Sequence, residues 1–86
     1  MKATVVKSRE EFLEAYKDVY KDAGELIEGR RWVKLKETGR MFHVLADDSP
    51  AYKQTYTWVG DYSEGLAPAR EDMDPSLINH NGIITD

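Results

Sequence analysis

Residues 30–46 read RRWVKLKETGRMFHVLA, two segments of alternating apolar and polar side chains on either side of Thr38-Gly39. Alternation with a period of two is typical of a β-strand with one buried face, and a Thr-Gly pair suits a tight turn. We therefore predict a β-hairpin of residues 30–37 and 40–46. A two-residue turn would pair Leu35 with Phe42 and Val33 with Val44, because turn length fixes the register of a hairpin.

The two faces of this hairpin differ in character. Val33, Leu35, Phe42 and Val44 share one face, which we expect to form the core. Successive side chains of a strand point to opposite faces, so the remaining residues share the other one. These are Trp32, Lys34, Lys36, Met41, His43 and Leu45.

Upstream, the sequence predicts a helix that begins at Ser8. Ser8 and Glu11 form a capping box, in which each side chain pairs with an otherwise unpaired backbone N–H group. Apolar residues recur at helical spacing as far as Gly24 and continue to Ile27. Gly24 and Gly29 both suit the position after a helix end, and we favour the longer helix. Residues 2–7 and 54–59 are rich in β-branched and aromatic side chains, which predicts two further strands.

These elements predict an α+β fold of order β-α-β-β-β, with a four-stranded, mostly antiparallel sheet and one helix packed on one face. Periodicity fades after Gly60, where Gly, Pro and acidic residues accumulate. We therefore expect an α+β domain over residues 1–60 and an irregular, acidic C-terminal tail over residues 61–86. The sequence shows no evident internal repeat.

Charge is unevenly distributed between these two parts. The 86 residues carry a net charge of −4, yet residues 1–60 carry +1 and residues 61–86 carry −5. The acidic surface of the second part consists of Asp61, Glu64, Glu71, Asp72 and Asp74. The chain has no cysteine, which favours a reducing compartment, and no apolar run long enough to span a membrane. We expect a cytoplasmic protein without membrane contact.

The sequence contains no pattern that predicts catalysis or a cofactor. Phosphate-binding glycine loops and nucleophile motifs are missing, and the glycines are scattered singly. Neither His43 nor His80 has the spacing to other ligands that a zinc site needs. Adjacent acids, as at Asp47-Asp48, usually face water. We therefore predict no enzyme activity, no metal and no cofactor.

The face opposite the core suggests the function. One helix covers only one face of a sheet, so Trp32, Met41 and Leu45 would form an exposed apolar patch, which monomers seldom leave open. We predict a small acidic interaction protein, an inhibitor or adaptor, that binds another protein or a second copy of itself. The predicted partner-binding residues are Trp32, Lys34, Lys36, Met41, His43, Leu45 and Trp58.

The alternative is a module that binds single-stranded nucleic acid through the same hairpin. Arg30, Arg31, Lys34, Lys36 and Arg40 are five cations within eleven residues, with Trp32 among them. Cations that meet phosphates and aromatic rings that stack on bases are the usual means of such binding. The net negative charge of the chain makes nucleic acid the less favoured partner.

Overall fold

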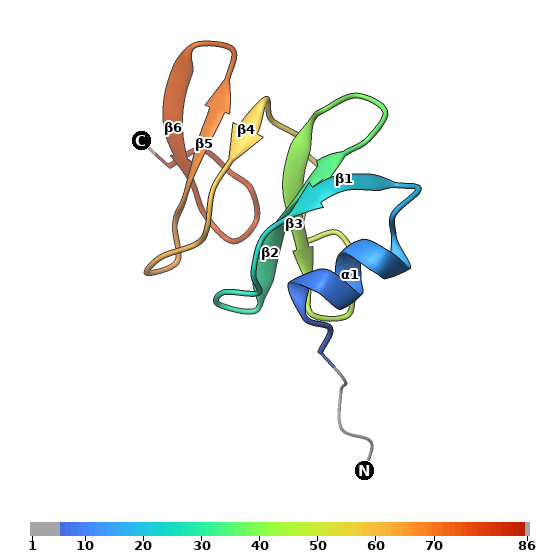
Figure 1. The fold of residues 1–86 in the computed structure, drawn as a ribbon. Helices are drawn as coiled ribbons and strands as arrows, with labels where there is room; N and C mark the ends of the chain where they lie inside the picture. Colours follow the sequence, from blue (N-terminus) through green and yellow to red (C-terminus); the bar gives the residue numbers. More distant parts are fainter. Residues whose placement is uncertain (1–5, 86) are drawn as a thin grey trace.

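The computed structural model describes residues 6–85, and over this range the fold is α+β with one helix and six strands. The strands form two three-stranded antiparallel sheets (Figure 1). Sheet A has the order β1-β2-β3 and sheet B the order β4-β5-β6. The elements are α1 (Arg9–Ala15), β1 (Tyr20–Ala23), β2 (Arg30–Leu35), β3 (Met41–Leu45), β4 (Trp58–Val59), β5 (Ala67–Glu71) and β6 (Asp74–Ile78).

The predicted start of the helix is confirmed, and its predicted end is wrong. The Ser8 hydroxyl accepts a hydrogen bond from Glu11 N–H, and the Glu11 carboxylate accepts one from Ser8 N–H. The helix ends at Ala15, after which residues 16–19 turn and β1 begins. Tyr20, whose aromatic side chain favours extended backbone, opens β1 and pairs with Leu35 of β2. The apolar spacing that predicted a longer helix is therefore shared between α1 and a strand.

The β2–β3 hairpin forms with the predicted faces but with a different register. Val33 pairs with Phe42 and Trp32 with His43, so each residue lies two positions from its predicted partner. The cause is the loop, because Leu35 N–H donates to Arg40 O and four residues, Lys36 to Gly39, close the hairpin. A shift of two positions keeps every side chain on its predicted face.

A single four-stranded sheet with an irregular acidic tail is not what the structure shows. β5 and β6 form a second hairpin closed by Asp72 and Met73, and Asp72 has a positive φ of 59°. β4 begins at Trp58 and pairs with β5, while Tyr56 bridges to Met41 of β3. Of the predicted first strand, residues 2–5 lie outside the described residues, and Val6 and Lys7 are not part of a strand.

Sheet A lies in the middle of the fold, with α1 packed on one of its faces and sheet B on the other. On one side, Phe12 of α1 stacks with Tyr20, and Tyr20 meets Phe42 edge-on. On the other side, His43 of β3 contacts Tyr52, which precedes sheet B, and Tyr62, which lies between β4 and β5. The order of layers is therefore α1, sheet A, sheet B, and the far face of sheet B has no further layer over it within the described residues (Figure 1).

The two sheets are structural repeats of one another, which the sequence did not reveal. Each is a three-stranded meander whose first turn is closed by a Glu-Gly pair, Glu28-Gly29 and Glu64-Gly65, with positive φ at both residues. Gly24 N–H donates to Trp32 O, and Gly60 N–H donates to Pro68 O in the equivalent place. Identical residues recur 36 positions apart at Tyr20 and Tyr56, Gly24 and Gly60, Glu28 and Glu64, and Gly29 and Gly65.

Candidate interaction surface

The side of sheet B that faces away from sheet A is exposed and largely apolar. Register places its members together, because Trp58 pairs with Arg70, Arg70 with Pro75 and Pro68 with Leu77. The alternating residues Val59, Ala67, Ala69 and Ile78 are buried against the rest of the molecule. We call the exposed side the outer face, and it consists of Trp58, Pro68, Arg70, Pro75 and Leu77.

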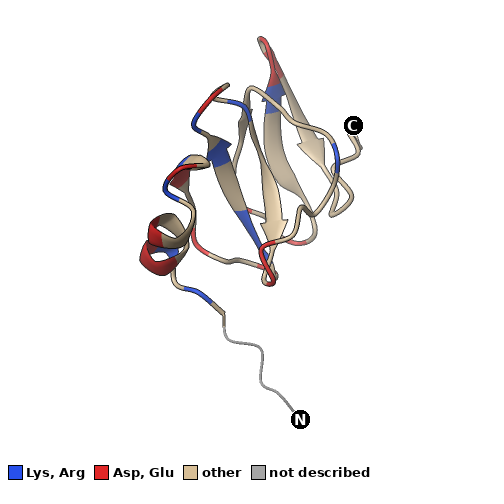
Figure 2. Cartoon of the chain, turned by 90° about the vertical axis from the view of Figure 1, so that its right-hand side faces the viewer, with Lys and Arg blue, Asp and Glu red and all other residues tan. Residues whose placement is uncertain are grey.

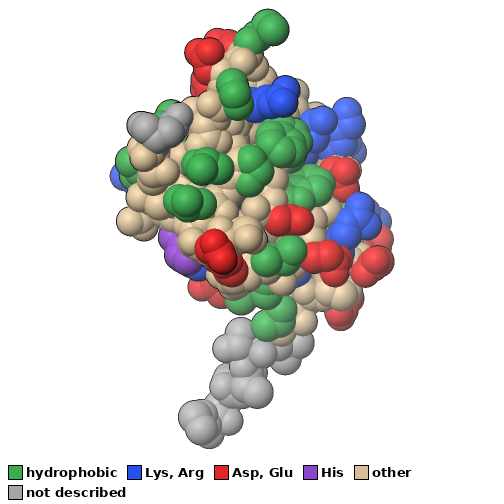
Figure 3. Space-filling view, turned by 90° about the vertical axis from the view of Figure 1, so that its left-hand side faces the viewer, with side chains coloured by type: hydrophobic (Ala, Val, Ile, Leu, Met, Phe, Trp, Pro, Cys, Tyr) green, Lys and Arg blue, Asp and Glu red, His purple; other side chains and the backbone are tan. Residues whose placement is uncertain are grey.

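Exposure of large apolar groups distinguishes the outer face from an ordinary sheet surface. Trp58 and Leu77 are each 43% exposed, and Met73 at the tip of the β5–β6 hairpin is 90% exposed. Figure 3 shows hydrophobic side chains gathered over this side of the molecule, with basic side chains beside them. Exposed aromatic and aliphatic groups with few charges among them are the composition of an interface centre.

Close packing around Gly60 shapes the outer face. A Cβ atom at Gly60 would lie 2.9 Å from Pro68 Cγ and 3.1 Å from the Trp58 ring, so the absence of a side chain lets both rings lie close to the backbone. The Arg70 guanidinium lies 6.0 Å from the centre of the Trp58 ring, within cation–π range. Open hollows of about 320 Å³ beside Trp58 and Arg70 and of about 350 Å³ between Pro68, Pro75 and Leu77 give the surface relief.

The predicted acidic surface is divided between the two ends of sheet B. Glu71, Asp72 and Asp74 lie at the tip of the β5–β6 hairpin, whereas Asp61 and Glu64 lie at the opposite end, beside the turn that precedes β5. Glu71 is paired with Arg40 at 2.9 Å, and this contact lowers the pKa of the Glu71 carboxyl. The tip therefore carries two further exposed carboxylates, Asp72 in the turn and Asp74 on the same side of the sheet as Glu71.

The residues predicted to bind a partner do not form one surface. Met41 and His43 are buried, because sheet B and the chain leading to it cover that face of sheet A. Trp32 is half-buried beside Gly24, Lys34 and Leu45 are partly buried, and Lys36 lies in the exposed hairpin loop. Trp58 alone lies on the outer face. No sequence pattern identified Pro68, Pro75 and Leu77 as surface-forming residues of a sheet, because their segment shows no strand periodicity.

His43 lies at the centre of a buried polar network. Its Nε2 is 2.8 Å from Gly60 O, which assigns the proton to Nε2, so Nδ1 accepts from the Tyr52 hydroxyl at 2.6 Å. Burial lowers the pKa of His43 to about 4 and raises the pKa of Tyr62 to about 12. Tyr62 and Tyr56 donate their hydroxyls to the carbonyls of Asn79 and Gly82. Each of these side-chain polar groups has a hydrogen-bond partner, which favours a structural role for them.

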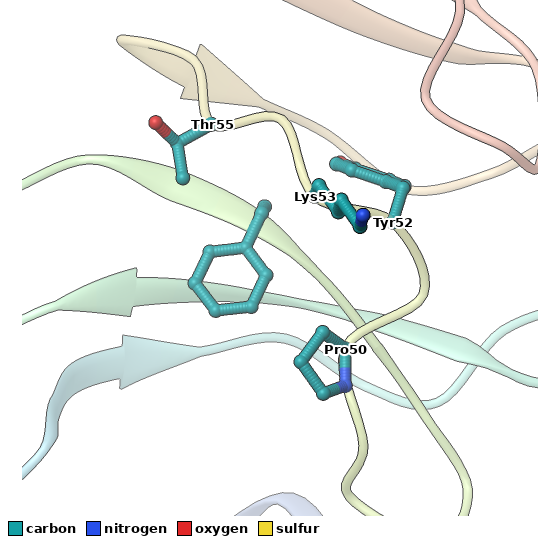
Figure 4. Close-up of a pocket in the computed structure, with 5 residues that line it drawn as sticks. Pro50, Tyr52, Lys53 and Thr55 are labelled. Atoms are coloured by element: carbon teal, nitrogen blue, oxygen red, sulfur yellow. The ribbon is translucent and has the colours of Figure 1, made fainter.

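A smaller hollow of about 260 Å³ lies where residues 50–55 cross β3 (Figure 4). Pro50, Tyr52, Lys53 and Thr55 surround it, with Phe42 as a further wall. The Tyr52 hydroxyl is already bonded to His43, and the Thr55 hydroxyl accepts from Arg40 Nε at 3.1 Å. The hollow holds no paired acid and base. Across residues 6–85 no cluster of three or more potential metal-binding side chains occurs.

The basic hairpin does not present its cations on one face. Arg31 is 3% exposed, donates to the carbonyls of Lys7 and Ser8, and lies 4.7 Å from the centre of the Phe12 ring. Arg40 is bound to Thr55 and Glu71. Figure 2 shows the Lys and Arg positions interspersed with Asp and Glu positions over the helix side of the molecule.

Comparisons with known proteins identify no relative of this chain. The chain matches no protein-family model, no curated protein and no solved structure. No helix within the described residues is both long enough and apolar enough to cross a membrane.

Proposed function

We propose that this chain is a small interaction protein, an inhibitor or adaptor without catalytic activity, that binds another protein through the outer face. The observation that carries the proposal is the exposure of Trp58 and Leu77 on a sheet whose other side buries Val59, Ala67, Ala69 and Ile78. Tryptophan at the centre of an exposed patch is the typical anchor of a protein interface. The complete absence of cysteine supports an intracellular, reducing setting for this activity.

The acidic hairpin tip supports the same proposal. Asp72 lies in the turn beside the outer face, and rim charges steer the approach of an oppositely charged partner. The alternative of single-stranded nucleic-acid binding gains little support. Of the five hairpin cations, Arg31 is buried and Arg40 is paired with Glu71, and the half-buried Trp32 lies against Gly24.

Site-specific photo-crosslinking tests the proposal. A photoreactive residue at position 58 should capture a defined protein in cells of the source organism. The same residue at position 19 is the control, because Val19 is 48% exposed but lies away from sheet B. Leu77→Asp should abolish capture by the probe at position 58 without lowering the melting temperature. Equal capture from both positions, or capture insensitive to Leu77→Asp, would refute binding through the outer face.

A further inference from the structure

We infer that Asn81 is a site of covalent modification, at which the side-chain amide is hydrolysed after attack by the backbone nitrogen of Gly82. The fold holds this reaction back until the turn of residues 79–83 opens. Three observations point to the site: the Asn81-Gly82 sequence, the hydrogen bonds that hold Gly82, and two tyrosine hydroxyls that end on this turn. No residue of the outer face takes part, so the site is independent of the proposed function.

The reaction needs only the two residues and water. The Gly82 nitrogen gives its proton to water and forms a bond to Asn81 Cγ, and the side-chain nitrogen of Asn81 leaves as ammonia. Water then opens the five-membered succinimide by cleaving one of its two C–N bonds. One cleavage leaves aspartate, and the other leaves isoaspartate, in which the backbone runs through Cβ. Glycine favours the attack, because it has no side chain beside the reacting nitrogen.

The folded turn keeps the attacking nitrogen away from solvent. Gly82 N–H donates to Asn79 O at 3.0 Å. The side-chain oxygen of Asn79 accepts from Asn81 N–H at 2.9 Å and from Ile83 N–H at 3.1 Å. Asn81 itself is exposed, whereas Gly82 is buried, and a Cβ atom on Gly82 would lie 2.5 Å from the Tyr52 ring. Because the Gly82 N–H must leave Asn79 O and meet water before it reacts, hydrolysis requires a local opening of the turn.

Two tyrosines anchor this turn to the core. The Tyr56 hydroxyl donates to Gly82 O at 2.6 Å, and the Tyr62 hydroxyl donates to Asn79 O at 2.6 Å. Both tyrosines are buried, and both carbonyls belong to the turn whose opening frees the Gly82 N–H. The two hydroxyls therefore control how often the turn opens and, through it, the rate at which Asn81 is hydrolysed.

The two products differ in their effect on the fold. Aspartate at position 81 keeps the length of the backbone and places its carboxylate on an exposed side chain. Isoaspartate adds one carbon to the backbone, which moves Gly82 O away from the Tyr56 hydroxyl and the Gly82 backbone away from the Tyr52 ring. A chain that has opened and reacted to isoaspartate therefore closes less well, and the modification is a lasting record of opening.

Incubation of the purified chain at one pH and temperature, folded and in guanidinium chloride, tests the site. Peptide mapping by mass spectrometry measures the replacement of amide by carboxyl at each asparagine. We expect conversion of Asn81 to be at least about tenfold faster in the unfolded chain. Asn79 is the internal control and should convert more slowly there, because the His80 side chain hinders the attack. Equal rates for Asn81 in the folded and unfolded chains overturn protection by the fold, and no conversion in the unfolded chain overturns the site.

Hydroxyl deletions test the anchors. Tyr56→Phe and Tyr62→Phe, each shown by circular dichroism to be folded, should raise the conversion of Asn81 in the folded chain several-fold. Tyr16→Phe is the matched control, because its hydroxyl is bonded to Asp48 and not to the turn. Equal acceleration in all three variants, or none in Tyr56→Phe and Tyr62→Phe, overturns gating by the turn.

Thermal unfolding tests the consequence for the fold. The isoaspartate form, separated by ion-exchange chromatography from a chain aged in denaturant and refolded, should melt below the Asn81→Asp variant. Asn81→Asp should melt close to the unsubstituted chain. Equal melting temperatures of the isoaspartate form and Asn81→Asp overturn the claim that the modification weakens the turn.

Discussion

The ring of His43 is held neutral between Tyr52 and Gly60, and this gives the stability of the fold a dependence on pH. The pKa of His43 is about 4 in the folded chain against 6.5 for a free histidine. The unfolded state therefore binds a proton first as pH falls, and stability present above about pH 6.5 is lost as pH falls toward 4. The difference in pKa corresponds to about 3 kcal/mol in the free energy of unfolding.

Urea unfolding at pH 7, 5.5 and 4.5, roughly spanning the interval between the two pKa values, measures this contribution. The slope of stability against pH should be smaller in His43→Gln than in the unsubstituted chain. His80→Gln is the control, because His80 is partly exposed and, among residues 6–85, its side chain is bonded to Glu28 alone. Proton NMR provides an independent check, since the His43 ring should not titrate near pH 6. A His43 ring that protonates at the usual pH would show that His43 is not held buried between Tyr52 and Gly60.

Gly82 is a second residue at which the structure makes a sharp prediction. Its φ is +74°, and a Cβ atom there would lie 2.5 Å from the Tyr52 ring. Gly29 has a similar φ of +75° with nothing within 4 Å, so it isolates the cost of backbone strain. We expect Gly29→Ala to cost about 1 kcal/mol and Gly82→Ala clearly more, because Tyr52 must move and its bond to His43 is disturbed. If chemical denaturation shows equal losses of stability for the two variants, the Tyr52 ring does not lie against Gly82.

At the scale of elements, Ile78 and Ile84 test whether β6 belongs to the core. Ile78 is completely buried, whereas Ile84 is 50% exposed. Replacing Ile78 by Ala should cost about 2–5 kcal/mol in the free energy of unfolding, as for other buried aliphatic residues. Replacing Ile84 by Ala should cost well under half of that, since little burial is lost. Small and similar losses for both would support an irregular tail after all.

Sequence patterns predicted the elements that local chemistry specifies. The capping box at Ser8 and the two faces of the β2–β3 hairpin were predicted correctly, because hydrogen-bonding capacity and strict alternation are local signals. β5 was missed, because its sequence APARE holds no β-branched or aromatic residue. Its extended form depends on pairing with β4 and β6 and on burial of Ala67 and Ala69, which are tertiary effects.

The candidate surface was predicted only in part for the same reason. The prediction of an uncovered face on sheet A assumed that the fold has one helix and one sheet. The structure has a second sheet, which covers that face. Trp58 was identified from its residue type. The other residues of its face could not be identified, because they depend on the register of β5, which no sequence pattern predicted. Proline at 68 and 75 indicated a break, whereas the structure places Pro75 on an edge strand, where a missing N–H group is tolerated.

At the scale of the whole molecule, the two meanders differ mainly in the length of one loop. The β2–β3 hairpin is closed by Lys36 to Gly39, and the β5–β6 hairpin by Asp72 and Met73 alone. Leu35 and Arg40 correspond to Glu71 and Asp74 as closing pairs. If the sheets are true repeats, the longer loop is dispensable, and the first hairpin should also close with two residues.

Replacing Lys36–Gly39 by Asn-Gly should therefore leave the chain folded, with a change in the free energy of unfolding within about 1 kcal/mol. The first residue of the new turn keeps the amide that Lys36 donates to Val19 O, so β1 retains this contact. Thermal unfolding of the shortened chain beside the unsubstituted one measures this change. A two-residue turn that unfolds the chain would show that the loop of sheet A has a structural role without a counterpart in sheet B.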